Sequence, residues 1–531
     1  MTDRRRSNRM ARSAIQHAIS RRELLRMGGV VIPAGLMLPR WMIANAQTAT
    51  TFDFYISTTG SDSNPGTVSQ PWAITSLVST SPNNSKMAGK RLGLIAGTYT
   101  IPGTMGNGRY PTNNSYCVLS IPPGTASAST YVGSSDTNGN YSARAATIVL
   151  AAGGQGSAGG SKWYNAVIGC DYLASGNAYV TIDGLVVNGN GMDSLAAGNE
   201  GAHLIFFQSG TTDNYTRPGT MLGVVVQNCE VFGINATDAG GNDAAVWFQG
   251  CSGAVLQNCY IHDVNKSDQV DHAHGHEEYG CQGSQILYNT FTNCTGGGAE
   301  SKTGCLNNVA AYNYFYNCSV NAPPGNAAVI QGWDGGEQPD GAASQFQVHH
   351  NIFDGCGRVC FGEYFNALHE DGFAWYNNTI YSSGTVVLQA TGPWIQHYNN
   401  LYVVTSGSAS GVAQFTNGDT NPLAYDSVYS TTGGSYSGAF SGQTEANLMT
   451  GQDPQFTGGT ANIVSGNGAA QFQLASGSPC VGAGRVGGAS SGSAVNIGAW
   501  DGTVTQVGCS FASGGTATAT PVPNAPVLTV S

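Results

Sequence analysis

The chain has 531 residues, of which 75 are glycine and only 10% are charged, and its formal net charge at pH 7 is −11. Disordered chains have high net charge and few β-branched or aromatic residues, so this composition excludes general disorder. The length also exceeds what a single globular core spans, but it does not limit a solenoid, whose coils contact only their neighbours.

The first 46 residues are predicted to be an export signal. Five arginines precede the sequence Ser-Arg-Arg-Glu-Leu-Leu-Arg at 20–26, a stretch that resembles a twin-arginine signal. The apolar run at 27–38 is too short to span a membrane, and Ala-Asn-Ala at 44–46 is typical of a cleavage site. The alternative is a retained N-terminal anchor or a chance basic tail. We therefore expect a periplasmic or secreted protein with no stable membrane span after cleavage.

Removal of the signal makes the chain strongly acidic. Residues 1–46 hold nine of the 20 basic residues and two of the 31 acidic ones, so the mature chain keeps 11 basic and 29 acidic residues, a net charge of −18. Nucleic acid is excluded as a partner, because its affinity rests on clustered lysine and arginine. Binding of an anionic polysaccharide would require Ca²⁺ or a local basic cluster to offset the repulsion.

The middle of the chain repeats a strand-like phrase in which an alternating apolar run reaches an asparagine. Copies 22 to 38 residues apart predict a stack of units too small to bury their own cores. Alternation and frequent glycine indicate coils of a β-solenoid. We interpret the repeated asparagines as structural groups at the turns. They are Asn228, Asn258, Asn289, Asn313, Asn351, Asn378 and Asn400.

The thirteen cysteines follow the same repeat. Equivalent residues on neighbouring coils lie about 4.8 Å apart, a separation that a disulfide accepts. Cross-coil disulfides such as Cys229–Cys259 and Cys294–Cys318 are therefore one reading in an oxidising compartment. The other is a ladder of buried thiols that pack as small apolar residues. The absence of paired Cys-x-x-Cys motifs disfavours zinc.

Both ends of the repeat carry further signatures. The N-terminal part has a strand at 52–57, the turn Gly-Ser-Asp-Ser-Asn-Pro-Gly-Thr at 60–67 and the strand ending Gly-Thr-Tyr at 97–99, and the C-terminal part has Asp-Pro-Gln-Phe at 453–456 and Asn-Ile-Gly-Ala-Trp at 496–500. Over about residues 52–502 the chain resembles secreted right-handed parallel β-helix proteins of the pectin-lyase-like group. The resemblance implies an all-β, single-stranded right-handed parallel β-helix with an N-terminal cap and long loops on one side. The predicted domains are the signal at 1–46, the β-helix at 47–508 and a flexible tail at 509–531.

The first candidate for chemistry is the segment 268–279. If it is extended, His272, His274 and His276 share one face. Histidines with carboxylates can bind a transition metal, and the acids alone can bind Ca²⁺. We assign Asp268, Asp271 and Glu277 as candidate metal ligands, with a solvated polar loop as the alternative.

The second candidate is Gly-Gly-Gly-Ala-Glu-Ser-Lys-Thr at 296–303. It resembles the chondroitinase B and alginate lyase family locally, which implies that Lys302 takes the C5 proton of a uronic acid and that Glu300 binds Ca²⁺. The family's Arg-His-Gly on the next coil is replaced here by Gln331-Gly-Trp333, so Arg358, His274 or His276 would donate the proton. The alternative is a surface lysine paired with Glu300.

The third candidate is an acidic set that extends from Asp334 to Asp371. Two facing carboxylates would hydrolyse a glycosidic bond, while the aromatic faces of Trp333, Tyr364 and Trp375 would hold sugar rings. We assign Gln331, Trp333, Asp334 and Tyr364 to substrate binding.

The sequence thus predicts an exported enzyme on polysaccharide, with β-elimination of a uronic-acid glycan as the first reading. Hydrolysis of a neutral or weakly charged glycan and a non-catalytic glycan-binding or adhesion solenoid remain the alternatives. The possible cofactor is Ca²⁺.

Overall fold

In the computed structural model, the described residues all lie within the unit that spans residues 48–519. They are 51–102, 117–151, 166–173, 177–192, 201–209, 221–236, 242–266, 273–302, 304–319, 329–333, 346–363, 373–382, 388–391, 395–405, 412–416, 423–436, 439–441 and 445–511. The predicted signal lies outside them. Within these ranges, no helix has the length and apolar character needed to cross a membrane.

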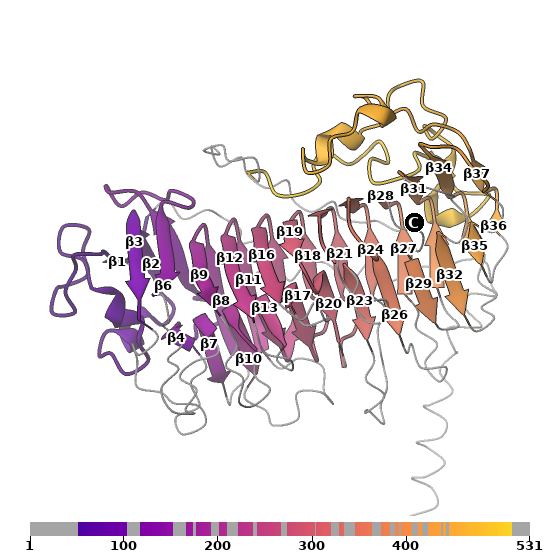
Figure 1. Ribbon diagram of the computed structural model, residues 1–531. Helices are drawn as coiled ribbons and strands as arrows, with labels where there is room; N and C mark the ends of the chain where they lie inside the picture. The colour runs from indigo at the N-terminus through magenta and orange to yellow at the C-terminus, as the bar shows by residue number, and fades with distance from the viewer. Residues whose placement is uncertain are drawn as a thin grey trace, which may run out of the picture. The chain divides into compact units, whose positions relative to one another are not determined.

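Three long parallel sheets run the length of this unit, and the chain visits them in turn (Figure 1). Sheet 1 contains β1 (Phe54–Ile56), β2 (Arg91–Ile95), β5 (Thr130–Ser135), β8 (Asn177–Asp183), β11 (Met221–Gln227), β14 (Cys251–Ser252), β15 (Val255–Gln257), β18 (Gln285–Leu287), β21 (Val309–Ala311), β24 (Gln347–His349), β27 (Phe373–Tyr376), β30 (Ile395–Tyr398), β33 (Leu423–Ala424) and β36 (Glu445–Ala446). Sheet 2 contains β3 (Gly97–Ile101), β6 (Ala146–Leu150), β9 (Val186–Met192), β12 (Glu230–Ala236), β16 (Tyr260–Lys266), β19 (Thr290–Cys294), β22 (Tyr314–Tyr316), β25 (Ile352–Asp354), β28 (Thr379–Ser382), β31 (Leu401–Val404), β34 (Ser427–Ser430) and β37 (Met449–Thr450).

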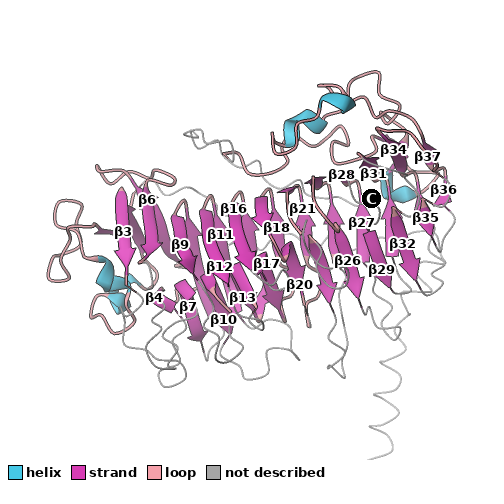
Figure 2. Cartoon of the chain, viewed as in Figure 1, coloured by secondary structure: helices cyan, strands magenta, loops and turns pink. Residues whose placement is uncertain are grey.

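Sheet 3 carries the candidate site. It contains β4 (Cys117–Ser120), β7 (Ala166–Leu173), β10 (His203–Ser209), β13 (Asp243–Gln249), β17 (Ala273–Tyr279), β20 (Gly297–Ser301), β23 (Ile330–Trp333), β26 (Cys360–Glu363), β29 (Leu388–Thr391), β32 (Ala413–Thr416) and β35 (Phe440–Ser441). Short 3₁₀ helices η1 (Ile74–Leu77) and η2 (Asn84–Met87) lie near the N-terminal end, and η3 (Thr460–Asn462), η4 (Ala469–Phe472), η5 (Val486–Gly488) and the pair β38 (Gly484–Arg485) and β39 (Ala494–Val495) follow the last coil. The predicted all-β parallel β-helix is confirmed (Figure 2).

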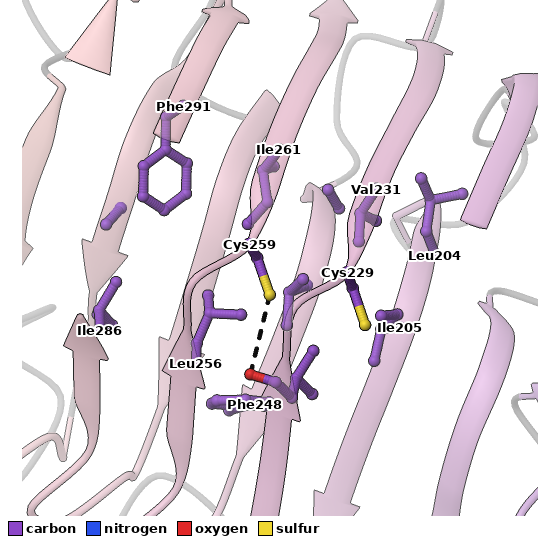
Figure 3. Close-up of a cluster of buried hydrophobic side chains, with 14 of the residues drawn as sticks. Leu204, Ile205, Cys229, Val231, Phe248, Leu256, Cys259, Ile261, Ile286 and Phe291 are labelled. Carbon is purple, nitrogen blue, oxygen red and sulfur yellow. Dashed lines mark hydrogen bonds between the residues drawn. The ribbon is translucent and has the colours of Figure 1, made fainter. Parts of the chain in front are cut away.

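The core is a set of side-chain rows that continue from coil to coil. Leu256 on one coil and Ile286 on the next point into the same interior (Figure 3). The rings of Phe291, Phe315 and Phe353 stack with centroids 4.9 Å apart at each step. A Cβ on Gly275 would come within 2.4 Å of the Phe291 ring, so glycine is required where this stack faces β17.

A buried ladder of asparagine amides joins the coils at the turn between sheets 1 and 2. Asn313 is typical: its Nδ2 donates to Ile286 O (2.9 Å) and Asn351 Oδ1 (3.0 Å), and its Oδ1 accepts from the backbone N–H of Asn289 (2.8 Å). The predicted structural role is confirmed for the five asparagines from 289 to 400.

Asn228 and Asn258, the first two asparagines of the predicted repeat, lie one residue before the ladder position. Cys259 N–H donates to Asn289 Oδ1, so Cys259 and its counterpart Cys229 occupy the ladder position. Asn228 and Asn258 precede it, with φ of 57° and 49°. Asparagine tolerates this left-handed conformation better than most residues, which explains why it recurs one position earlier in these two coils.

Of the two readings of the cysteines, the structure supports the ladder of thiols: none of the twelve cysteines whose side chains are described forms a disulfide. Cys259 and Cys229 point into the core between apolar side chains (Figure 3). The Cys259 thiol donates weakly to Val226 O at 3.8 Å, and burial raises its pKa well above the usual value. These thiols are therefore small core residues, as the alternative reading held.

After the last coil, residues 451–511 run back along the outside of the solenoid (Figure 1). Phe456, Phe472 and Ile497 form a second apolar cluster with sheet 2 residues such as Ile352 and Leu401. Residues 509 and 510, at the start of the predicted tail, donate backbone N–H groups to Thr290 Oγ1 and Asn258 Oδ1. We call 451–511 the C-terminal strap.

Candidate functional site

On sheet 3, a break in the usual inward–outward alternation of side chains determines which residues face away from the core. On β13, Ala245 and Val246 both belong to the main core, whereas Ala244 and Trp247 belong to a separate cluster. The outward positions are therefore three residues apart, and the register of β17 on β13 transfers this spacing to His274 and Glu277. Both side chains consequently lie on the face away from the core.

Four ionisable side chains meet on this face. His274 Nε2 lies 3.0 Å from Glu300 Oε2, and Lys302 Nζ lies 2.9 Å from Glu277 Oε1 and 3.1 Å from Glu300 Oε2. Glu277 and Glu300 are register partners on β17 and β20. The side chains of the histidine and both glutamates are fully buried, whereas that of Lys302 is 3% exposed. We call these four residues the His-Glu-Lys cluster.

Burial and mutual attraction shift the pKa values of all four groups. Burial alone would raise the pKa of Glu300, but Lys302 and His274 outweigh it and hold that pKa at about 2. Burial, with Glu300 nearby, raises the pKa of Glu277 despite the opposing effect of Lys302. Burial disfavours the charged forms of His274 and Lys302, but the glutamates outweigh it and raise both pKa values. Lys302 is therefore held as an ammonium ion.

An aromatic row leads to the cluster from the N-terminal side. The Trp247 and Tyr279 rings lie 5.1 Å apart, and Phe206 lies 6.3 Å from Trp247 on the preceding coil. Lys302 Nζ is 5.2 Å from the centroid of Tyr279, within the range of a cation–π contact. Asn242 joins both, since its Nδ2 donates to the Tyr279 hydroxyl (3.0 Å) and its Oδ1 accepts from Lys302 (3.4 Å).

The segment around the predicted histidines is extended, but His274 and His276 do not share a face. His276 packs edge-on against Phe248 in the core at 4.8 Å, and its Nδ1 contacts Val246 O at 3.1 Å. Glu278 also points inward, where its Oε2 accepts from Asn308 Nδ2 (2.9 Å). The break in alternation on β13 and β17 is the reason, so a strict two-residue period misplaces His276.

Other predicted residues lie further along the same sheet. Gln331 on β23 is the register partner of Glu300, and Trp333 ends that strand. Arg358 precedes β26, whose Cys360 pairs with Ile330, so it stands two strands beyond Glu300. Asp268, Asp271, Asp334 and Tyr364 lie outside the described residues.

The described donors fit Ca²⁺ poorly, but the predicted ligands Asp268 and Asp271 lie outside the described residues, so Ca²⁺ stays a prediction. Calcium takes six to eight oxygen ligands, whereas the cluster offers two carboxylates together with a histidine nitrogen and an ammonium group. A histidine with two carboxylates fits a divalent transition metal better.

Sequence reasoning missed Tyr279, Trp247 and Asn242. Tyr279 ends the segment that was singled out, so its closeness to the acids was visible. Trp247 and Asn242 lie some 30 residues earlier, one coil away, and only the register of β13 on β17 brings them to the cluster.

Comparison with known proteins gave structural likenesses alone. No family model and no curated protein matches the chain. A pectate lyase, Pel9A, is similar with a TM-score of 0.49 and 15% identity, covering 86% of this chain and 98% of its own. A rhamnogalacturonan lyase is similar with a TM-score of 0.39 and 17% identity, covering 73% of this chain and 88% of its own.

Proposed function

We propose that the protein is an exported enzyme that cleaves a uronic-acid-containing polysaccharide by β-elimination, with the His-Glu-Lys cluster at its centre. The observation that carries the proposal is the concentration of His274, Glu277, Glu300 and Lys302 in one buried contact network on the outer face of sheet 3. Burial of ionised groups costs several kcal/mol each, and strongly shifted groups cluster at functional sites.

The shape of sheet 3 supports a linear substrate. One register row runs over successive coils through Phe206, Trp247, Glu277, Glu300 and Gln331. Adjacent strands are about 4.8 Å apart, so the row is a straight track of aromatic and polar positions. Aromatic faces suit the apolar faces of sugar rings. A polymer lying along the row would reach Lys302 first, because its side chain keeps 3% exposure whereas those of the other three members are fully buried.

β-Elimination needs a base for the C5 proton and a positive charge near the sugar carboxylate. Lys302 is the candidate base, and in this role it must first lose its contacts with Glu277 and Glu300, because these contacts keep it protonated. His274, whose pKa is raised by Glu300 and Glu277 against the effect of burial, lies 3.0 Å from Glu300 and would supply positive charge in its protonated form.

One observation favours a second candidate, glycoside hydrolysis. The pKa of Glu277 is raised while that of its register partner Glu300 is lowered to about 2. A pair of carboxyl groups split in this way can act as general acid and as ionised partner. In that reaction Glu277 would donate the proton to the leaving sugar.

The two reactions differ in their products. The experiment incubates the mature protein with a panel of polyuronates and neutral glycans, and reads ultraviolet absorbance and reducing ends together. β-Elimination predicts an absorbing unsaturated product from a polyuronate, which Lys302→Met abolishes and Lys90→Met leaves unchanged. New reducing ends without absorbance would support hydrolysis, and binding without cleavage of any glycan would overturn both.

A further inference from the structure

We infer that His274, Glu277 and Glu300 form a binding site for one divalent transition-metal ion, and that the Lys302 ammonium occupies this site in the metal-free protein. The inference concerns metal binding alone and stands whether the chain is a lyase, a hydrolase or neither.

The three side chains have the spacing of a metal site. One ligand atom from each lies within 4.8 Å of the other two. A metal about 2.1 Å from its ligands holds them at most about 4.2 Å apart, so a small closing movement suffices. All three residues belong to β17 or β20, two paired strands of one sheet, which fix ligands more firmly than loops do.

The carboxylates also have unused coordinating atoms. Oε2 of Glu277 and Oε1 of Glu300 are buried and have no hydrogen-bond partner. The buried carboxylate of Asp183, by contrast, has partners for both oxygens. It accepts four hydrogen bonds of 2.7–2.8 Å, from the side chains of Tyr131, Tyr141, Gln227 and Asn228. Buried carboxylate oxygens without partners are costly, and coordination to a cation would satisfy them.

Lys302 marks where a cation sits. Its ammonium lies 2.9 Å and 3.1 Å from one oxygen of each glutamate. A metal bound to the same carboxylates would lie only a few ångströms from this ammonium, where two positive charges repel strongly at low dielectric. The metal and the ammonium are therefore alternative occupants, and metal binding displaces the Lys302 ammonium from the two carboxylates.

The donor set selects the class of metal. One imidazole nitrogen and two carboxylates suit ions such as Zn²⁺ and Mn²⁺, whereas Ca²⁺ prefers oxygen ligands alone. Three protein ligands also leave a coordination position open for water or substrate.

The test is metal binding by the mature protein after treatment with a chelator, without any glycan. Calorimetry with Zn²⁺, Mn²⁺ and Ca²⁺, with metal analysis after dialysis, should show one Zn²⁺ or Mn²⁺ per chain and at least tenfold weaker Ca²⁺ binding. Replacing the ligand in His274→Gln should weaken binding by tenfold to a hundredfold or more. Lys302→Met removes the competing charge and should strengthen binding at least tenfold.

His262→Gln is the matched control. His262 also lies between two acids, Glu230 at 3.3 Å and Asp263 at 2.8 Å, but its two ring nitrogens contact them separately, so they do not converge on one point. The metal affinity of the His262→Gln variant should equal that of the wild type.

The inference is overturned if Ca²⁺ binds more tightly than both transition metals, if His274→Gln leaves the affinity unchanged, or if Lys302→Met fails to raise it. If circular dichroism shows that a variant does not fold, a measurement on the wild-type protein still tests the metal site. With Co²⁺ it should show visible absorption from a nitrogen- and oxygen-ligated ion, abolished by excess Zn²⁺, and the absence of this signal contradicts the site. Failure of the proposed enzyme activity would leave these results unaffected.

Discussion

Lys302 is the residue on which the cluster depends most. It is the cation shared by two buried carboxylates, so its loss leaves like charges facing each other in a buried site. Removing one partner of a buried pair costs about 3–5 kcal/mol. We therefore expect Lys302→Met to lower the free energy of unfolding by that amount in denaturant titrations.

The exposed Lys90 provides the comparison, because Lys90→Met should change stability by no more than about 0.5 kcal/mol. The double variant Lys302→Met/Glu300→Gln should recover part of the loss. Equal stability of Lys302→Met and the wild type would contradict the ion-pair network.

His203 predicts a dependence of stability on pH. It is buried beside Phe206 and Trp247, and burial lowers its pKa to about 3. The unfolded chain takes up this proton below about pH 6.5 and the folded chain only near pH 3, so stability is complete above pH 6.5 and falls as the pH drops. The slope is at most about 1.4 kcal/mol per pH unit.

Measuring unfolding from pH 7 to pH 4 for the wild type and His203→Gln isolates this contribution. The difference in stability between them should shrink as the pH falls. A difference that stays constant would show that His203 is not neutral in the folded protein.

At the scale of the element, the asparagine ladder fixes the register of the coils. Asn313→Ala removes two donated bonds and leaves the amide of Asn289 without its acceptor. Unsatisfied buried groups cost about 1–3 kcal/mol each, so we expect a loss of about 3 kcal/mol or more in thermal or chemical unfolding. The exposed Asn467→Ala should be neutral, and a similarly small effect for Asn313→Ala would contradict the ladder.

The strand elements also show what the sequence can and cannot reveal. The repeat and the alternation predicted the coils, because rows of apolar side chains must stack in any solenoid. They did not reveal that β17 carries two consecutive inward positions, which separates His276 from His274. That break is set by register with β13, a contact between residues 30 apart.

The same limit applies to the site. Glu300 and Lys302 were found through the local resemblance of residues 296–303 to a lyase family, and Glu277 because it lies in a segment rich in histidines and acids. Their meeting depends on the pairing of β17 with β20. Tyr279 and Asn242 complete the surroundings through contacts that no local pattern contains.

At the scale of the whole molecule, the C-terminal strap covers apolar surface of sheet 2. Phe456, Phe472 and Ile497 pack against Ile352 and Leu401. A mature chain that ends at residue 452 should therefore expose this surface, bind a hydrophobic dye and unfold at a lower temperature. A chain that ends at residue 511 keeps these contacts and should melt like the full-length protein; equal melting of the two truncated chains would show that the strap contributes nothing.

We propose that the activity of the protein resides on the outer face of sheet 3. The most direct measurement is glycan cleavage by Lys302→Met and Lys90→Met beside the wild type, on the polysaccharide that the wild type degrades fastest. We predict that Lys302→Met loses at least a thousandfold of the activity while still folded, and that Lys90→Met retains all of it. A folded Lys302→Met enzyme with wild-type activity would contradict the assignment of the site.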